Sequence, residues 1–182
     1  NPVGILDWYT ILIGVFGLVA AAGHGALYLA WRTQGAVQAR SHALARPLWA
    51  AVAGLWAVAT LATWIVSPGL LARLPHAPLA WLFSAVFLAG LTAVFLGLAR
   101  ERHLMAFLGS GAFIVGLLGA SGACIWPVML KSTLDPALAL TAQNASVGIH
   151  GLRAGLAWWV LGFPLAAGYV APLFRIHRGK IR

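Results

Sequence analysis

Charge is scarce in this sequence. Of its 182 residues, 12 are Lys or Arg and 3 are Asp or Glu, so charged residues make up 8% and hydrophobic residues 62%. Typical soluble domains hold about 25% charged and about 45–50% apolar residues. A soluble protein of this size needs a polar face on most of its helices to meet water. The composition therefore excludes an ordinary soluble domain and indicates an integral membrane protein.

Cysteine and acidic residues are nearly absent as well. The single cysteine, Cys124, excludes an internal disulfide and a multi-cysteine metal site, and we expect it to be a small apolar residue inside a span. The acids Asp7, Glu101 and Asp135 all lie at span ends, which argues against a proton-driven pump or transporter acting alone. Glycine-rich nucleotide loops, catalytic triads and zinc-binding His pairs are also missing. The sequence therefore predicts no catalytic residue and no metal ligand.

Five long apolar runs lie between the few charges, at residues 8–31, 47–66, 79–99, 104–128 and 149–174. Each is close to the ~20 residues that an α-helix needs to cross a hydrocarbon core of ~30 Å. The predicted fold is an all-α, polytopic transmembrane helix bundle of five spans forming a single domain. Because the chain opens with Asn1 and Pro2 and without Met, we expect it to be a piece of a longer protein.

The basic residues alternate between the two sides of these spans. Alternate gaps, with the tail, hold nine Lys and Arg on one side and three on the other. Cytoplasmic loops carry the excess of such residues, so the start of the chain is predicted outside and the tail in the cytoplasm. A net charge of +9 suggests nucleic acid in a soluble protein, but here it is a topology signal, and no nucleic-acid partner is predicted.

Several residues near the span ends have predictable roles. Asp7 precedes the first run as an N-cap, and Pro47 is expected at a helix start. Pro164 falls inside the fifth run and is expected to kink it. Tryptophans near the ends are expected to anchor the spans at the membrane interface: Trp49, Trp64, Trp81 and Trp126. Small residues form two stripes that predict close helix packing: Gly14, Gly17, Ala21 and Gly25, and then Ala112, Gly116 and Ala120.

His24, between Gly23 and Gly25 in the first run, is the strongest candidate for a functional group inside the membrane. A neutral imidazole there can ligate a haem iron or relay a proton. The alternative is a hydrogen bond to a neighbouring helix or subunit. We favour the hydrogen bond, because the chain offers His24 no acidic or second histidine partner.

Other charged and polar residues are assigned to the membrane surface. We expect His42, His76, His103 and His177 to be solvated or to face lipid headgroups. Arg153 lies one turn into the last span beside His150. Its side chain either snorkels to the headgroups, which we favour, or pairs with a carboxylate of a partner.

Two stretches resemble a known family. Residues 1–33 open with NPVGIL, continue with H-G-A-x-Y-L from His24 and close with Arg32-Thr33. Residues 126–182 hold P-x-x-L-x-S-T-L-D-P-A from Pro127, A-L-T-x-x-N-A-S from Ala139, a Trp pair and the ending AGYVAPLFRIHRGKI. Together they resemble the carboxy-terminal half of subunit II of cytochrome bd-type quinol oxidases, and are most similar to the cyanide-insensitive branch.

The resemblance implies a function in aerobic respiration in a bacterial cytoplasmic (inner) membrane. Such oxidases oxidise a membrane quinol and reduce oxygen to water. Their haems b and d are bound by subunit I, so the resemblance implies a non-catalytic subunit that binds no cofactor itself and has subunit I, quinol and membrane lipid as partners. The family position of His24 is His or Gln, which fits a hydrogen bond. The acids of the family's proton route belong to the half that these residues do not match.

The resemblance also implies that residues 131–146 form a shaped outer loop. We expect turn and cap hydrogen bonds from Ser132, Thr133, Asp135, Asn144 and Ser146. The rival interpretation is a membrane transporter or channel module with no redox role. Its polar lining would have to come from very few intramembrane polar residues.

Overall fold

The computed structural model describes residues 6–132, 135–176 and 179. It is almost entirely helical, and five of its helices are long and apolar enough to cross a membrane. These are α1 (Trp8–Arg32), α2 (Gly35–Val66), α4 (Pro78–Ala99), α5 (His103–Ile125) and α6 (Ile149–Ile176). The predicted all-α fold with five spanning helices is confirmed.

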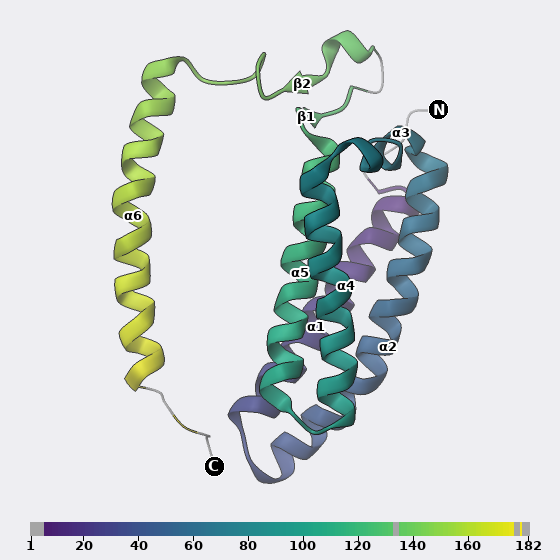
Figure 1. The fold of residues 1–182 in the computed structure, drawn as a ribbon, viewed down its shortest axis with the longest axis vertical. Coiled ribbons are helices and arrows are strands. Elements are labelled where there is room, and N and C mark those ends of the chain that lie inside the picture. The colour runs from purple at the N-terminus through teal and green to yellow at the C-terminus, as the bar shows by residue number, and fades with distance from the viewer. Residues whose placement is uncertain (1–5, 133–134, 177–178, 180–182) are drawn as a thin grey trace. The chain divides into compact units, whose positions relative to one another are not determined.

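The chain divides into two compact units, with the boundary between Cys124 and Ile125. The first unit contains α1, α2, α4 and α5, with the short helices α3 (Pro68–Leu71) and η1 (Leu74–His76) connecting α2 to α4 (Figure 1). The second unit contains the strands β1 (Val128–Leu130) and β2 (Leu140–Thr141), the turn η2 (Pro136–Leu138) and α6. Because each unit is described by itself, a single bundle of all five spans stays a prediction.

The core of the first unit draws on all four of its long helices. Phe16 and Leu27 come from α1, and Trp49 from α2. Trp49 lies edge-on to Phe113 of α5 with 5.4 Å between ring centroids, and Phe113 lies edge-on to Phe87 of α4 at 6.0 Å. Edge-to-face aromatic pairs at this separation add to the dispersion energy of close packing. Three interlocking rings therefore hold α2, α4 and α5 together.

Glycines allow α4 and α5 to approach until their backbones touch. A Cβ atom added to Gly116 would lie 2.5 Å from the backbone nitrogen of Phe87, and one added to Gly90 would lie 2.6 Å from the carbonyl oxygen of Gly109. The predicted small-residue stripe on the fourth span therefore marks a close helix contact. The stripe on the first span does not, since Gly14, Gly17 and Gly25 have no such neighbour within 4 Å. On α1 the close contact is at Gly23, where an added Cβ atom would lie 3.0 Å from Nε1 of Trp49.

Helix α2 is longer than predicted. It begins at Gly35 instead of Pro47 and contains 32 residues, a length of about 48 Å. Pro47 lies inside the helix, so its prediction as a helix start was wrong. The turns before Pro47 are rich in Ala, which favours helix. Gly35 supplies the positive φ of 64° at the tight connection from α1. At the membrane surface, water can satisfy the carbonyl that a proline frees.

Other helix ends differ by less. The fourth span ends at Ile125 instead of residue 128, because Val128 enters the strand β1, which pairs antiparallel with β2. Asp7 caps α1 as predicted: its carboxylate accepts a hydrogen bond from the Thr10 backbone N–H, and the Thr10 hydroxyl is bonded to the Asp7 backbone. The bond from the Thr10 N–H lowers the pKa of the Asp7 carboxyl below its ordinary value.

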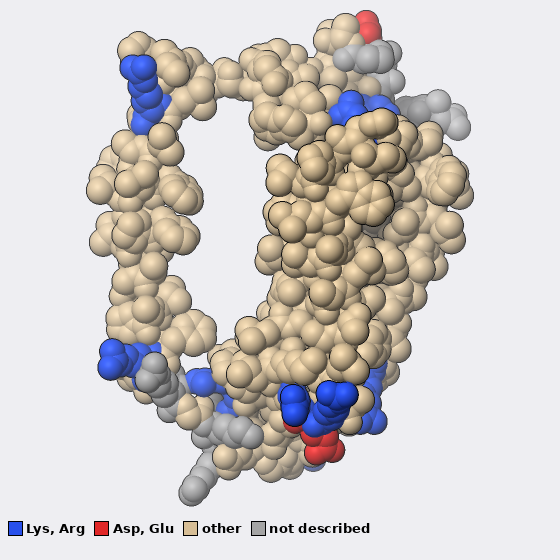
Figure 2. Space-filling model, in the orientation of Figure 1, with Lys and Arg blue, Asp and Glu red and all other residues tan. Residues whose placement is uncertain are grey.

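Arginines gather at one end of the first unit. That end carries the last residue of α1, the first turns of α2 and the connection from α4 to α5, and therefore five arginines with one acid, Glu101. The arginines are Arg32, Arg40, Arg46, Arg100 and Arg102. Figure 2 shows the blue residues clustered at the lower end of this unit. We call it the arginine-rich end, and the predicted topology places it in the cytoplasm.

Candidate functional site

An aromatic cluster joins α1 to α5 in the half of the unit nearer the arginine-rich end. His24, Tyr28 and Trp31 follow one another at helical spacing on α1 and all contact Phe107 of α5. The His24 ring is stacked on Phe107 with centroids 4.8 Å apart, and the Trp31 ring is stacked at 5.3 Å. The spacing of four and then three residues places side chains on one helix face. The His24 ring is thus fixed by stacking on Phe107, and a hydrogen bond to Ser110 fixes it as well.

The hydrogen bond of His24 crosses from α1 to α5. Its Nδ1 lies 2.7 Å from Oγ of Ser110, which is fully buried. The Ser110 hydroxyl lies 2.6 Å from the carbonyl oxygen of Phe107 and donates to it. A hydroxyl has one proton to give, so Ser110 must accept from His24. This places a proton on Nδ1 of His24, and in the neutral imidazole it leaves the lone pair on Nε2.

A haem ligand would need a free ring nitrogen on His24 and space beside it. A metal-bound histidine commonly donates one ring N–H to a neighbouring group and binds the metal with the other nitrogen, as the tautomer of His24 would allow. A large ligand also needs a cavity of about 300–1,000 Å³ beside that nitrogen. The groove of about 730 Å³ in this unit is lined by α4, α5 and Arg102, and not by His24. Within the described residues there is also no group of three His, Cys, Asp or Glu residues that could hold a metal ion. The residues around His24 therefore form a contact between α1 and α5, and the groove of this unit does not lie beside His24.

Four other hydroxyls of the long helices in this unit are also engaged within the protein. Thr60, Thr63 and Thr92 donate to the carbonyl oxygens four residues earlier on their own helices. The Tyr9 hydroxyl is bonded to Oγ1 of Thr63 at 2.9 Å. Polar groups that satisfy their own helices do not form the lining of an aqueous path. This arrangement favours a packing role for the unit over a transport role.

Sequence reasoning missed the roles of two residues in this region. It did not identify Ser110 as the partner of His24, although Ser110 lies between Gly109 and Gly111 as His24 lies between Gly23 and Gly25. That shared pattern was the available signal. Trp49 was expected at the interface, and this was wrong: its side chain is 0% exposed. The extension of α2 moves Trp49 from a helix start to an interior turn.

His42 also differs from its prediction. Both of its ring nitrogens are buried, and within the described residues neither has a hydrogen-bond partner. Its ring lies edge-on to that of His103, with centroids 5.2 Å apart. The prediction that His42 is solvated or faces lipid headgroups does not fit these buried nitrogens, because its segment is a helical extension of α2 and not a loop. His177 lies outside the described residues.

The remaining predicted residues belong to the second unit. Oγ of Ser132 accepts from the Asp135 N–H at 3.2 Å, and Oδ1 of Asp135 accepts from the Ala137 N–H at 2.8 Å. Oδ1 of Asn144 accepts from the Thr141 N–H at 2.7 Å, and the Ser146 hydroxyl donates to the Gln143 carbonyl. These are turn hydrogen bonds. Thr133 lies outside the described residues.

Arg153 and Pro164 both lie in α6. Arg153 is the fifth residue of this helix, and Pro164, like Pro172, lies inside it. The helix continues through both prolines, as spanning helices can. The choice between snorkelling and pairing for Arg153 stays a prediction.

Two comparisons with known proteins bear on the family. No curated protein matches the chain. A family model described as cytochrome bd terminal oxidase subunit II matches residues 2–177, almost the whole sequence. With its five long apolar helices, the chain is a multi-pass membrane protein. It therefore belongs to the cytochrome bd terminal oxidase subunit II family.

Proposed function

We propose that this chain supports a haem-bearing partner, subunit I, and binds no haem itself. The complex would oxidise a membrane quinol and reduce oxygen to water, with haems b and d held by the partner. The observation that carries the proposal is the family match over residues 2–177. It is supported by the first unit, where His24, Ser110 and the intramembrane threonines are all engaged in bonds within or between helices.

The proposed location is the bacterial cytoplasmic membrane, with the arginine-rich end facing the cytoplasm. Cytoplasmic segments are enriched in Lys and Arg, and this end holds five arginines, whereas the connection from α2 to α4 holds only Arg73. Quinol oxidation and oxygen reduction would then take place on the partner, while the packed helices of this chain separate the partner from lipid. A transporter without a redox role is not favoured by the family match or by the polar groups of the spans.

The activity test uses the complex. The full-length subunit with an affinity tag is produced together with the neighbouring oxidase subunit and purified in mild detergent. We expect the tag to recover both chains and a preparation that consumes oxygen when a reduced quinol analogue is added. Recovery of the tagged chain alone, or a two-chain preparation without quinol-dependent oxygen uptake, would contradict the proposal.

Substitution of His24 separates a packing role from a haem ligand. His24→Gln keeps a donor that can reach Ser110, whereas His24→Ala removes the bond and part of the stack on Phe107. We expect both variants to retain the haem content of the wild-type complex. His24→Ala should lower the free energy of unfolding by about 1–2 kcal/mol more than His24→Gln, because hydrogen bonds between spans contribute about 0.6–1.7 kcal/mol.

The measurement is the haem content per complex by pyridine haemochrome, together with stability in detergent. Thr92→Ala provides the control, because Thr92 is bonded only to its own helix at Leu88 in the described contacts. A loss of one haem per complex in His24→Gln would show that His24 ligates iron.

A further inference from the structure

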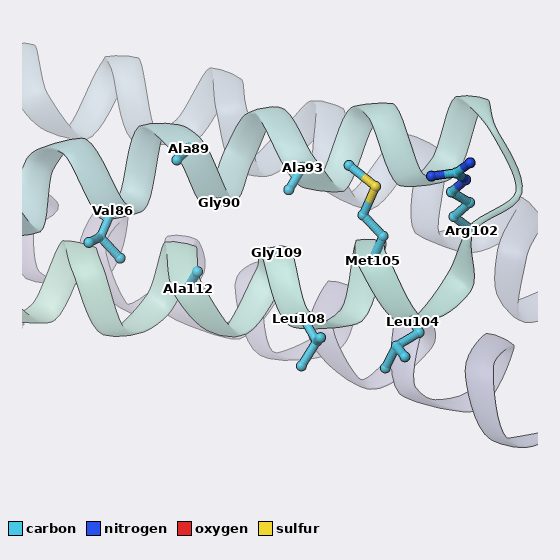
Figure 3. Close-up of a pocket in the computed structure, with 10 residues that line it drawn as sticks. All are labelled: Val86, Ala89, Gly90, Ala93, Arg102, Leu104, Met105, Leu108, Gly109 and Ala112. Atoms are coloured by element: carbon cyan, nitrogen blue, oxygen red, sulfur yellow. The ribbon is translucent and has the colours of Figure 1, made fainter.

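A groove runs along the surface between α4 and α5 (Figure 3). Its volume is about 730 Å³, within the range of about 300–1,000 Å³ that is typical of ligand sites. Gly90 and Gly109 form its floor, where the two backbones touch and no side chain projects. Val86 lies at one end of the groove, and Leu108 lies on the α5 side. The same glycines that bring α4 and α5 together thus leave a trough on the outer surface of the pair.

The chemistry of the groove is apolar with one exception. The small side chains of Ala89, Ala93 and Ala112 line its length, and Leu104 and Met105 follow toward one end. Arg102 closes that end, with its guanidinium group beside Met105 (Figure 3). The occupant must therefore be an apolar chain that carries an anionic or strongly accepting group at one end.

The length of the groove matches one leaflet of a membrane. From Leu104 to Ala112 the lining covers eight residue steps of α5, or about 12 Å. One leaflet contributes about 15 Å of a hydrocarbon core of about 30 Å. A packed spanning helix would follow α4 and α5 over their whole length, but the lining ends at Val86 and Ala112. The dimensions fit an acyl chain better than a transmembrane helix.

The charge at the Arg102 end of the groove selects the kind of lipid. Arg102 belongs to the arginine-rich end, where Arg100 and Arg46 also lie and where Glu101 is the single acid of the described residues. Arg46 is already engaged with the carbonyl of Leu98, which leaves Arg102 as the charged residue of the groove lining. The cytoplasmic leaflet carries the anionic lipids, and each basic residue at its surface attracts them.

We propose that the α4–α5 groove binds one acyl chain of an anionic phospholipid, whose phosphate lies on Arg102. The apolar contacts with the small residues of α4 and α5 hold the chain, and the guanidinium group fixes the depth of the headgroup. The lipid fills a surface that the subunit itself leaves open, and it stabilises the close contact between α4 and α5.

The test uses the purified two-subunit complex in detergent and phosphatidylglycerol with a photoreactive diazirine on one acyl chain. After illumination, labelled peptides are identified by mass spectrometry, with unlabelled phosphatidylglycerol or phosphatidylcholine as competitor. We expect the label on peptides 86–93 and 104–112. Phosphatidylglycerol should compete about fivefold better than phosphatidylcholine, as expected for the contribution of one arginine near the surface.

Two pairs of variants make the test specific. Ala89→Phe fills the groove and should abolish the label, whereas Ala85→Phe adds the same ring to an exposed position of α4 outside the lining and should keep it. Arg102→Gln should remove the preference for phosphatidylglycerol, whereas Arg100→Gln, in the same connection but outside the lining, should preserve it.

Three results would overturn the proposal. The first is an unlabelled groove in the wild-type complex, and the second is a label that survives Ala89→Phe. The third comes from photoreactive methionine at position 105: cross-links to α6 or to the partner subunit instead of lipid would show that a helix occupies the groove. Haem absorbance of each variant confirms assembly, so loss of the label is not mistaken for loss of the complex.

Discussion

Gly116→Ala will force α4 and α5 apart and prevent normal assembly of the complex. The added methyl group would lie 2.5 Å from the backbone nitrogen and 2.9 Å from the Cα of Phe87, and 2.8 Å from the carbonyl oxygen of Phe83. These are backbone atoms and cannot rotate away, so a whole helix must move. Overpacking of a close-packed contact costs about 1–3 kcal/mol and sometimes more, and we expect a loss of about 3 kcal/mol or more here.

Gly111→Ala is the matched control for this prediction. Gly111 lies on the same helix, but a Cβ atom there has no such neighbour within 4 Å. Its substitution should be neutral or slightly stabilising, since alanine favours helix over glycine by about 1 kcal/mol. Both variants are compared by the yield of assembled complex and by SDS titration in mixed micelles. Equal stability of the two variants would mean that α4 and α5 are not in backbone contact at Gly116.

Trp49→Ala will destabilise the first unit by about 3–5 kcal/mol, the range for removal of a large buried aromatic side chain. Trp49 is fully buried, lies edge-on to Phe113 and faces Gly23 of α1. Alanine would leave a cavity between three helices. In a membrane the lost stability is lost van der Waals contact, because association of spanning helices depends on such contact and not on the hydrophobic effect.

Trp49→Phe and Trp64→Ala test the cause of that effect. The Trp49 indole nitrogen is buried, and within the described residues it has no hydrogen-bond partner, so phenylalanine gives up volume but no hydrogen bond. We expect less than half of the loss seen for alanine. Trp64 is 66% exposed, and its substitution should change stability by no more than about 0.5 kcal/mol. Stability is measured by thermal unfolding of the detergent-solubilised complex. A Trp49→Ala variant as stable as Trp64→Ala would place Trp49 at the membrane interface after all.

The number and nature of the long helices were predictable because hydrocarbon imposes a simple rule. A span must be apolar over about 20 residues, and its backbone must bond within itself. Residues 79–99 obey this rule and form α4 at nearly the same bounds, Pro78–Ala99. The rule does not apply beyond the hydrocarbon core, where a helix can continue with polar residues. The segment Gly35–Arg46 extends α2 in this way, and the start of α2 was therefore missed.

The partners of individual side chains were harder to predict, since helix packing decides them. His24 was identified from its polarity alone, but Ser110 is 86 residues away in the sequence, and only the contact between α1 and α5 joins them. Trp49 is of a residue type that often anchors spans at the interface. Because α2 begins at Gly35, before Pro47, Trp49 lies inside the helix and in the core instead. The groove at Arg102 had no sequence signal, because it results from the packing distance between two helices.

The central claim is that this subunit supports the haems of a partner and carries none. The most direct measurement is the reduced-minus-oxidised visible spectrum, with haem quantified per chain, of the full-length subunit purified alone and together with its partner. The account predicts no haem absorbance from the subunit alone and both b-type and d-type bands from the pair. Stoichiometric haem on the subunit alone, lost in His24→Ala, would contradict it.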